Sequence, residues 1–240
     1  LALLICYFFL RCRPHFLAHF WQQYGHHILF EESIFFLGLL FLFVIRSFQP
    51  EILGLEKFMD AGFIQAYLKS PTLPAQDIWF ALEEINYYSF GHFYNAILVQ
   101  LWRFDLAYAY NFLLIALFAI FIVEICSLAY NLTASLLVKP FFTGSKVRAA
   151  RVARIASVLA IFLVALGGNG HPLWYFWQHG NMEAYWYPDA TRFITHTIHE
   201  FPAYSFVVSD LHAHVLSLPI SLLLLLSIFL WLQELWRTRV

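Results

Sequence analysis

Long uninterrupted runs of apolar residues constrain this chain more than any other feature of its sequence. Apolar side chains make up 61% of its 240 residues and charged side chains only 12%, whereas water-soluble domains carry about 25% charged residues. The runs at 32–49, 106–130, 152–167 and 214–236 approach or reach the roughly 20 residues that a helix needs to cross a bilayer. Because a spanning segment must satisfy its backbone hydrogen bonds internally, the sequence predicts an all-α, polytopic integral membrane helical bundle.

The apolar run at residues 1–10 is too short to cross a bilayer alone, but it can complete a span that begins upstream. The chain also starts at Leu1, without a methionine. We therefore expect residues 1–240 to form a single transmembrane domain that is a fragment of a longer protein. The first run is not expected to be a signal peptide.

Basic residues orient the predicted spans. The densest basic group lies between the runs at 106–130 and 152–167, and short basic loops stay in the cytoplasm. Its members are Lys139, Lys146, Arg148, Arg151 and Arg154. This orientation makes 50–105 and 168–212 extracytoplasmic loops if the helix expected at Tyr88–Phe104 is interfacial or re-entrant. A true crossing by that helix stays open.

Two further features concern the membrane itself. Histidines and glutamines interrupt the apolar pattern at His15–Phe30, which predicts a helix that lies in the membrane interface or packs under the bundle. Glu124 lies inside an apolar run, where a charge is costly, and is a functional candidate for that reason. A simple pairing of Glu124 with a neighbouring helix is the alternative.

The stretch from Glu56 to His92, within the loop at 50–105, is the one long polar interval in the first half of the chain, and its residues suit a carbohydrate or lipid-phosphate pocket. Glu56 and Asp60 are four residues apart and share one face of the short helix predicted over 56–69. We expect these two acids to be catalytic. Expected substrate contacts in the same loop are Asp77, Trp79, Tyr87, Tyr88 and His92. An ordinary solvated loop is the alternative.

The loop at 168–212 leads into an Asp-x-His-x-His run formed by Asp210, His212 and His214. In an extended segment alternate residues point the same way, so all three side chains can approach one divalent metal ion or one phosphate. In a helix they would diverge and would form only a polar cap on the last span.

Other polar residues of this second loop are candidates for binding the substrate. Arg192 either pairs with Asp189, three residues earlier, or holds a phosphate through its forked guanidinium group. Glu200 belongs to the same concentration of acids on the extracytoplasmic side. We expect all three residues to contact the substrate.

Composition excludes several other classes of site. A formal net charge of -1 argues against nucleic acid as a partner, because binding to the phosphate backbone needs clustered basic residues. Cys6, Cys12 and Cys126 have no metal-like spacing, so neither a disulfide framework nor a zinc site is indicated.

Several separated motifs resemble a known family in sequence and order. They are EKFMD (56–60), SPTLPAQDIWF (70–80), INYYSFGHF (85–93), AYN (109–111), DATRFI (189–194) and EFPAYSFVVSDLHAHV (200–215). Over about residues 50–220 the chain resembles the YYY-signature family of large prokaryotic membrane proteins, with Ser89 in place of the third tyrosine of the signature.

That family is similar to the C superfamily of membrane glycosyltransferases, which take a sugar from a polyprenyl-phosphate donor. In those enzymes the first external loop carries an essential acid and is followed by an interfacial helix. The resemblance therefore implies a GT-C-like bundle and a catalytic role for Asp60.

These observations lead to the hypothesis of a glycosyltransferase in a prokaryotic plasma membrane. Asp60, or else Glu56, would take the proton of an acceptor hydroxyl as it attacks the sugar. The expected partners are a lipid-linked sugar and the bilayer, and a divalent metal ion is the only expected cofactor. The sequence leaves protein partners open. Two other hypotheses stay open: a transporter or non-catalytic subunit of a membrane complex, and a membrane metal hydrolase built on the Asp-x-His-x-His run.

Overall fold

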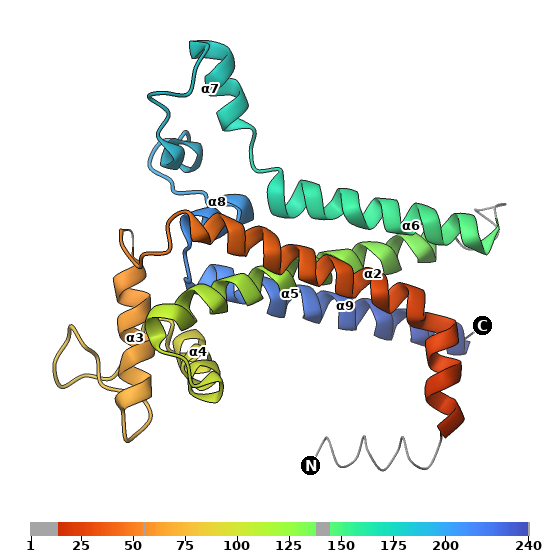
Figure 1. Ribbon diagram of the computed structural model, residues 1–240, viewed down its shortest axis with the longest axis horizontal. Helices are drawn as coiled ribbons and strands as arrows, with labels where there is room; N and C mark the ends of the chain where they lie inside the picture. The colour runs from red at the N-terminus through yellow and green to blue at the C-terminus, as the bar shows by residue number, and fades with distance from the viewer. Residues whose placement is uncertain (1–13, 55, 138–144, 240) are drawn as a thin grey trace.

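The computed structural model describes residues 14–54, 56–137 and 145–239, which form helices joined by irregular segments (Figure 1). The helices are α2 (Pro14–Ser47), α3 (Lys57–Lys69), α4 (Ser89–Trp102), α5 (Leu106–Leu136), α6 (Lys146–Ile161) with its π-helical continuation η1 (Phe162–Leu166), α7 (His171–His179), the short 3-10 helix η2 (Tyr187–Thr191), α8 (Pro202–Val208) and α9 (Ala213–Arg239). Within these ranges the only strand-like pairing is an isolated bridge between Gln76 and Glu84. The prediction of an all-α chain is confirmed, and the partial span expected at 1–10 lies outside the described residues.

Four of the described helices are long and apolar enough to cross a membrane. The spanning segments are Ala18–Ser47 in α2, Leu106–Leu136 in α5, Val147–Leu166 in α6 and η1, and Ala213–Trp236 in α9. Half of the most apolar window of α5 is buried inside the protein, against 11% in α2 and α9. Helix α5 packs against α2, α6 and α9, so it is the centre of the bundle.

The start of α2 differs from the sequence-based expectation. The helix predicted at His15–Phe30 is not a separate element, because this segment and the span expected at 32–49 form one continuous helix. Histidine and glutamine keep their backbone N–H groups and fit an α-helix, and no proline interrupts the segment after Pro14. Figure 1 shows the first turns of α2 bending away from the rest of the helix.

Both polar loops lie at the same end of the long helices, on the left in Figure 1. Helices α3 and α4 of the first loop pack on each other and lie across the direction of α5. Helix α4 has 14 residues, which at 1.5 Å per residue is about 21 Å. That length falls short of the roughly 30 Å hydrocarbon core of a bilayer, so α4 is too short to be the crossing that the sequence left open.

Asn111, near the start of α5, fixes the beginning of the first loop. Its Oδ1 accepts a hydrogen bond from Arg46 Nε at 2.8 Å, and its Nδ2 donates to the carbonyl oxygen of Pro50 at 2.9 Å. Arg46 belongs to the last turn of α2 and is only 4% exposed, so the bond gives a buried guanidinium a partner. The two bonds hold the end of α2 and the entrance to the loop against α5.

Gly38 allows α2 to approach α5 closely. A Cβ atom at this position would collide with Ile122 Cδ1 and lie 3.2 Å from Ala119 Cα. Small residues permit such close packing of membrane helices. We expect Gly38→Val to lower the free energy of unfolding by about 1–3 kcal/mol through overpacking, measured as a lower midpoint of thermal unfolding in detergent.

Leu40→Val is the matched control, because Leu40 lies on the same helix and is 58% exposed. It should change the unfolding midpoint little. Equal stability of the Gly38 and Leu40 variants would contradict the close packing of α2 on α5.

Candidate functional site

The first part of the site is the N-terminal end of α3. Glu56 is the N-cap residue, and its carbonyl oxygen accepts the N–H of Asp60 at 3.1 Å. The two acids lie at the positive end of the helix dipole, which favours negative charge, and their side chains leave the same face. The side chain of Glu56 is 59% exposed, whereas that of Asp60 is 0% exposed.

The second part of the site is the turn between α8 and α9. Ser209 ends α8 with a left-handed backbone, φ 67°, and the N–H of Asp210 then donates to the Ser205 carbonyl oxygen at 2.9 Å, as in common helix C-terminal motifs. Tyr110 of α5, which is fully buried, donates its hydroxyl to the Ser209 carbonyl oxygen at 3.1 Å. The turn thereby presents Asp210 and His212 to α3 immediately before α9 begins.

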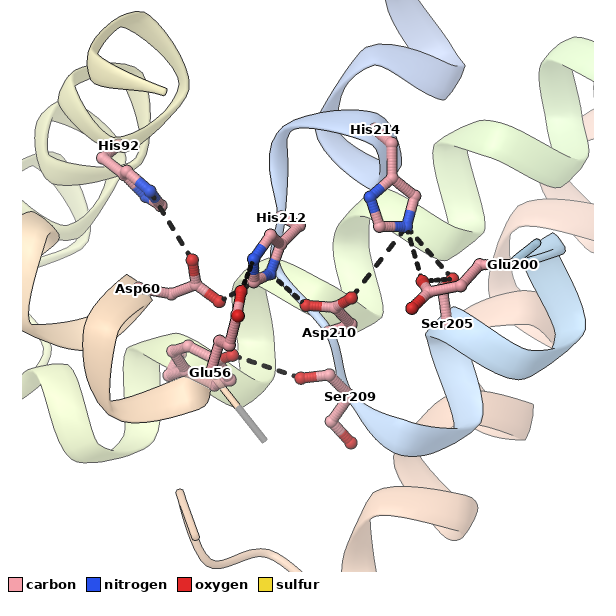
Figure 2. Close-up of polar contacts among 10 residues, drawn as sticks. Glu56, Asp60, His92, Glu200, Ser205, Ser209, Asp210, His212 and His214 are labelled. Atoms are coloured by element: carbon pink, nitrogen blue, oxygen red, sulfur yellow. Dashed lines mark hydrogen bonds and ion pairs between the residues drawn. The ribbon is translucent and has the colours of Figure 1, made fainter. Parts of the chain in front are cut away.

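His212 joins the two parts (Figure 2). Its Nε2 contacts the carboxylate of Glu56, its Nδ1 contacts the carboxylate of Asp210, and the same Nδ1 lies 3.3 Å from Asp60 Oδ2. Burial alone would lower the pKa of His212, but its contacts with Asp210 and Asp60 raise this pKa to about 11. Three carboxylates therefore surround one imidazolium group.

Asp60 is the most deeply buried of these three acids. Neither of its carboxylate oxygens has a hydrogen-bond partner of good geometry among the described residues. Burial raises the pKa of Asp60, and its contact with His212 opposes that shift. His92 of α4 places Nε2 3.5 Å from Asp60 Oδ1, but burial and the charge of His212 lower the pKa of His92 to about 4, so His92 is neutral.

Asp210 connects His212 to a second polar group. Its Oδ2 lies 3.9 Å from His214 Nε2, and the same Nε2 lies 3.0 Å from Glu200 Oε2 and 3.2 Å from Ser205 Oγ. The hydrogen bond to His214 holds the pKa of Glu200 below its ordinary value, although burial opposes this. The rings of His212 and His214 are 6.1 Å apart, and Figure 2 shows them on opposite sides of Asp210. The Asp-x-His-x-His side chains therefore do not converge on one point.

A cavity of about 580 Å³ opens over these groups. Residues of both loops line it, including Tyr87, Tyr88, Arg192, His199 and Glu200. The rings of Tyr87 and Tyr88 are 3.9 Å apart, and Tyr88 meets His212 edge-on at 5.6 Å. Tyr88 also has a left-handed backbone, φ 51°, a strain of roughly 1–3 kcal/mol that is most often found at functional sites.

An apolar groove of about 360 Å³ adjoins the cavity. It lies between the first turn of α4, at Gly91, and the first turns of α9, at Leu216 and Ser217, and Tyr88 lines both hollows. A Cβ atom on Gly91 would lie 2.7 Å from Leu216 Cδ1, so this glycine lets the two helices come together there. The groove runs along the beginning of a membrane-spanning helix.

Two residues that the sequence assigned to substrate binding lie outside the cavity lining. Asp77 accepts the backbone N–H groups of Trp79 at 2.8 Å and of Phe80 at 3.0 Å, which is a turn-stabilising role. Trp79 packs edge-on against Phe63 with ring centroids 5.2 Å apart. Both residues support the fold of the first loop.

Asp189 and His92 are also absent from the lining of this cavity, although His92 lies directly beneath Asp60. Arg192 does line the cavity. Its guanidinium donates to Thr191 Oγ1 at 2.9 Å and to the Pro188 carbonyl oxygen at 3.3 Å, and the described contacts include no ion pair with Asp189. Arg192 therefore keeps its charge available to the cavity.

Some residues of the site were not singled out from the sequence. Tyr110, Ser205 and Ser209 fall inside the AYN and EFPAYSFVVSDLHAHV motifs, but a motif does not tell which of its residues anchor a turn. His199 lines the cavity and was visible only as one of several histidines in the second loop. In the sequence, only its position next to Glu200 marks His199 as a candidate site residue.

The family model described as "Uncharacterized membrane protein (DUF2298)" matches residues 1–240, and the chain belongs to this family. No curated protein and no solved structure matches the chain. Membership of a membrane-protein family and the four spanning-length helices agree that this is an integral membrane protein of a lipid bilayer.

The bond from Tyr110 to Ser209 can be tested directly. We expect Tyr110→Phe to lower the free energy of unfolding by about 1–3 kcal/mol, because the buried carbonyl of Ser209 loses its donor. Tyr108→Phe is the control, since Tyr108 lies on the same helix and is 69% exposed. Thermal unfolding in detergent measures both variants, and equal midpoints would refute the anchoring role of Tyr110.

Proposed function

We propose that this member of the family is a membrane glycosyltransferase that moves a sugar from a polyprenyl-phosphate donor to an acceptor on the extracytoplasmic side of a prokaryotic plasma membrane. One observation carries the proposal: a cavity lined by acids, histidines and an arginine directly adjoins an apolar groove along α9, and Tyr88 lines both. A lipid-linked sugar has the matching chemistry, with an apolar chain next to a charged phosphate and a polar sugar. The resemblance of the loop motifs to the YYY-signature family supports the same assignment.

Glu56 is the best candidate for the general base. Its carboxylate lines the cavity and is 59% exposed, whereas Asp60 is fully buried beneath His212 and cannot touch an acceptor in this arrangement. As the acceptor oxygen bonds to the anomeric carbon, its proton passes to Glu56 and the bond from that carbon to the phosphate oxygen breaks. The products are the glycosylated acceptor and the free polyprenyl phosphate.

The leaving phosphate needs a positive partner, and Arg192 in the cavity lining supplies one. A guanidinium group binds phosphate oxygens with two parallel hydrogen bonds. His199 and His214 also line the cavity and offer ring nitrogens for hydrogen bonds. Tyr87 and Tyr88 offer aromatic faces on which a sugar can stack.

A transporter or non-catalytic subunit is the second candidate. Polar groups within the spanning helices favour it. The hydroxyl of Ser127 on α5 donates to the carboxylate of Glu31 on α2. A carboxylate oxygen of Glu124 on α5 is buried without a partner in the described part of the chain. Glu124 follows Tyr110 by 14 positions on α5, about 21 Å along the helix. We favour the transferase because the large polar cavity lies at the ends of the spanning helices, whereas transporter sites lie near the bilayer midplane.

Replacing the proposed base tests the reaction. Membranes containing the full chain are incubated with a polyprenyl-phosphate sugar carrying a radioactive label in the sugar. Loss of label from the lipid-extractable fraction measures transfer. We expect Glu56→Gln to slow this loss by roughly 10²–10⁴-fold, the usual contribution of a general base.

Glu83→Gln is the matched control, because Glu83 is an exposed acid of the same loop outside the cavity lining. It should transfer label at the rate of the unmodified chain. If membranes with the unmodified chain lose no more label than membranes without it, for donors of several sugars, the proposed function is wrong.

The apolar groove gives an independent prediction about the lipid chain. A bulky side chain in the groove should compete with the donor lipid, so we expect Ser217→Trp to raise the KM for a long-chain donor about tenfold and to change the kcat much less. Ser227→Trp is the control: Ser227 is exposed on the same helix, and each serine hydroxyl bonds to a carbonyl oxygen of its own helix. A kcat that falls while the KM stays constant would contradict the assignment of the groove to the donor lipid.

A further inference from the structure

We propose that a divalent metal ion binds between Asp60 Oδ2, Asp210 Oδ1 and His212 Nδ1. The site lies at the floor of the cavity assigned to the transferase and deepens that function, and only the ion's role in catalysis rests on the proposed function. The ion site itself is argued from geometry, burial and charge.

The three side chains come from two segments far apart in the chain, Asp60 from α3 and Asp210 and His212 from the turn before α9, and they lie close together. One ligand atom from each of Asp60, Asp210 and His212 lies within 4.8 Å of the others, and His212 Nδ1 is 3.3 Å from Asp60 Oδ2. Carboxylate oxygens and imidazole nitrogens bind a zinc-sized ion at roughly 2.0–2.2 Å. Ligand atoms around such an ion are therefore about 3 to 4.4 Å apart, and small side-chain shifts suffice to reach that spacing.

Asp60 gives an independent sign that a cation belongs here. The residue is 0% exposed, and no described residue gives either of its carboxylate oxygens a hydrogen bond of good geometry. Buried carboxylates normally have paired or coordinated oxygens. A metal ion at this point satisfies Asp60 Oδ2 and leaves Oδ1 facing His92.

The surrounding charges also call for a cation. Among the described residues, Glu56, Asp60 and Asp210 share His212 as their common ion-pair partner. The two other contacts are longer: His92 with Asp60 and His214 with Asp210. The buried Lys57 donates to the Leu53 carbonyl oxygen at 3.1 Å. In this part of the structure no lysine or arginine forms an ion pair with the three acids. A divalent ion between these acids would supply the positive charge that these lysines and arginines do not.

Glu56 completes the arrangement from the other side of the ring. It contacts His212 Nε2, so it can accept the Nε2–H while Nδ1 faces the ion. Histidines that bind metals commonly donate their second N–H to a carboxylate in this way, and the carboxylate fixes the orientation of the ring. The contact therefore selects Nδ1 as the ligand atom.

His214 is not a ligand of this ion. Its Nε2 is occupied by Glu200 at 3.0 Å and Ser205 at 3.2 Å. The set of Asp210, His212 and His214 expected from the sequence is thus replaced by a set in which Asp60 supplies the third ligand. Two carboxylates with one imidazole suit Mn²⁺ or Zn²⁺ better than Ca²⁺, which prefers six or more oxygen ligands.

A titration with Mn²⁺ alone tests the site. The full chain is purified in detergent, stripped with EDTA and titrated with Mn²⁺, and free Mn²⁺ is followed by its electron paramagnetic resonance signal. We expect one bound ion per chain that Zn²⁺ displaces. Asp60→Asn and Asp210→Asn should weaken binding at least tenfold, and Glu56→Gln should weaken it about 10–100-fold, as loss of an orienting carboxylate does.

His214→Ala distinguishes this site from the set expected from the sequence, which included His214. We expect its Mn²⁺ affinity to stay within about twofold of that of the unmodified chain. Bound Mn²⁺ should also show modulation from one imidazole nitrogen in electron spin echo spectra, lost in His212→Gln but kept in His214→Ala. Thermal unfolding without metal identifies any variant that fails to fold. If the Asp variants fail to fold, the nitrogen modulation in the unmodified chain and in His214→Ala still tests the site. Absence of stoichiometric binding, or equal losses in the Asp60 and His214 variants, overturns the proposal.

The same experiment keeps the two proposals apart. Stoichiometric binding in a protein that transfers no sugar supports the ion site and counts against the transferase. Sugar transfer by a chain that binds no Mn²⁺ or Zn²⁺ overturns the ion site and leaves the transferase standing.

Discussion

Two adjacent residues of α5 hold both loops in place, and the site depends on them. Tyr110 bonds to the Ser209 carbonyl oxygen, 99 positions away in the chain, and Asn111 bonds to the Pro50 carbonyl oxygen, 61 positions away. Tyr110 and Ser209 are fully buried, so the Ser209 carbonyl has no access to water and depends on the tyrosine hydroxyl. One turn of the central helix thus sets the distance between Glu56 and Asp60 on one loop and Asp210 on the other.

The acidic and basic groups of the cavity have different partners. Glu56 and Asp210 contact His212, whereas the guanidinium of Arg192 donates hydrogen bonds to neutral oxygens, those of Thr191 and the Pro188 carbonyl. A cation bound beside the acids and an anionic group bound by Arg192 would each meet an opposite charge. The buried carboxylate of Asp60, which has no hydrogen-bond partner among the described residues, is unfavourable without a compensating ligand.

Much of the fold follows from the sequence, because the bilayer leaves few alternatives to helices of about 20 apolar residues. The all-α architecture, the spans around 106–130 and 214–236, and the short helix that begins beside Glu56 all follow from hydropathy and spacing. The continuity of α2 does not, because histidines and glutamines on a helix look alike whether the helix lies in the interface or continues into a span. For the candidate site, spacing indicates which residues are polar and near a loop end, but not which carbonyl a tyrosine will bind. Asp77 and Trp79 illustrate the limit: their residue types suit a sugar site, yet one caps a turn and the other packs on Phe63.

The contrast between Glu56 and Asp60 shows what a helical pattern leaves undetermined. A spacing of four puts two side chains on one face, but the depth of each depends on what covers that face, and here the cover comes from residues far away in the chain. His92 of α4 lies beneath Asp60, and His212 of the second loop lies over it, so the acid that a family resemblance marks as catalytic is fully enclosed. An enclosed carboxylate is poorly placed to take a proton from a bulky acceptor but well placed to hold an ion and to orient the ring above it. The exposed Glu56, one turn earlier, is the better placed of the two acids to meet a substrate, so acids that the sequence treats alike are suited to different roles.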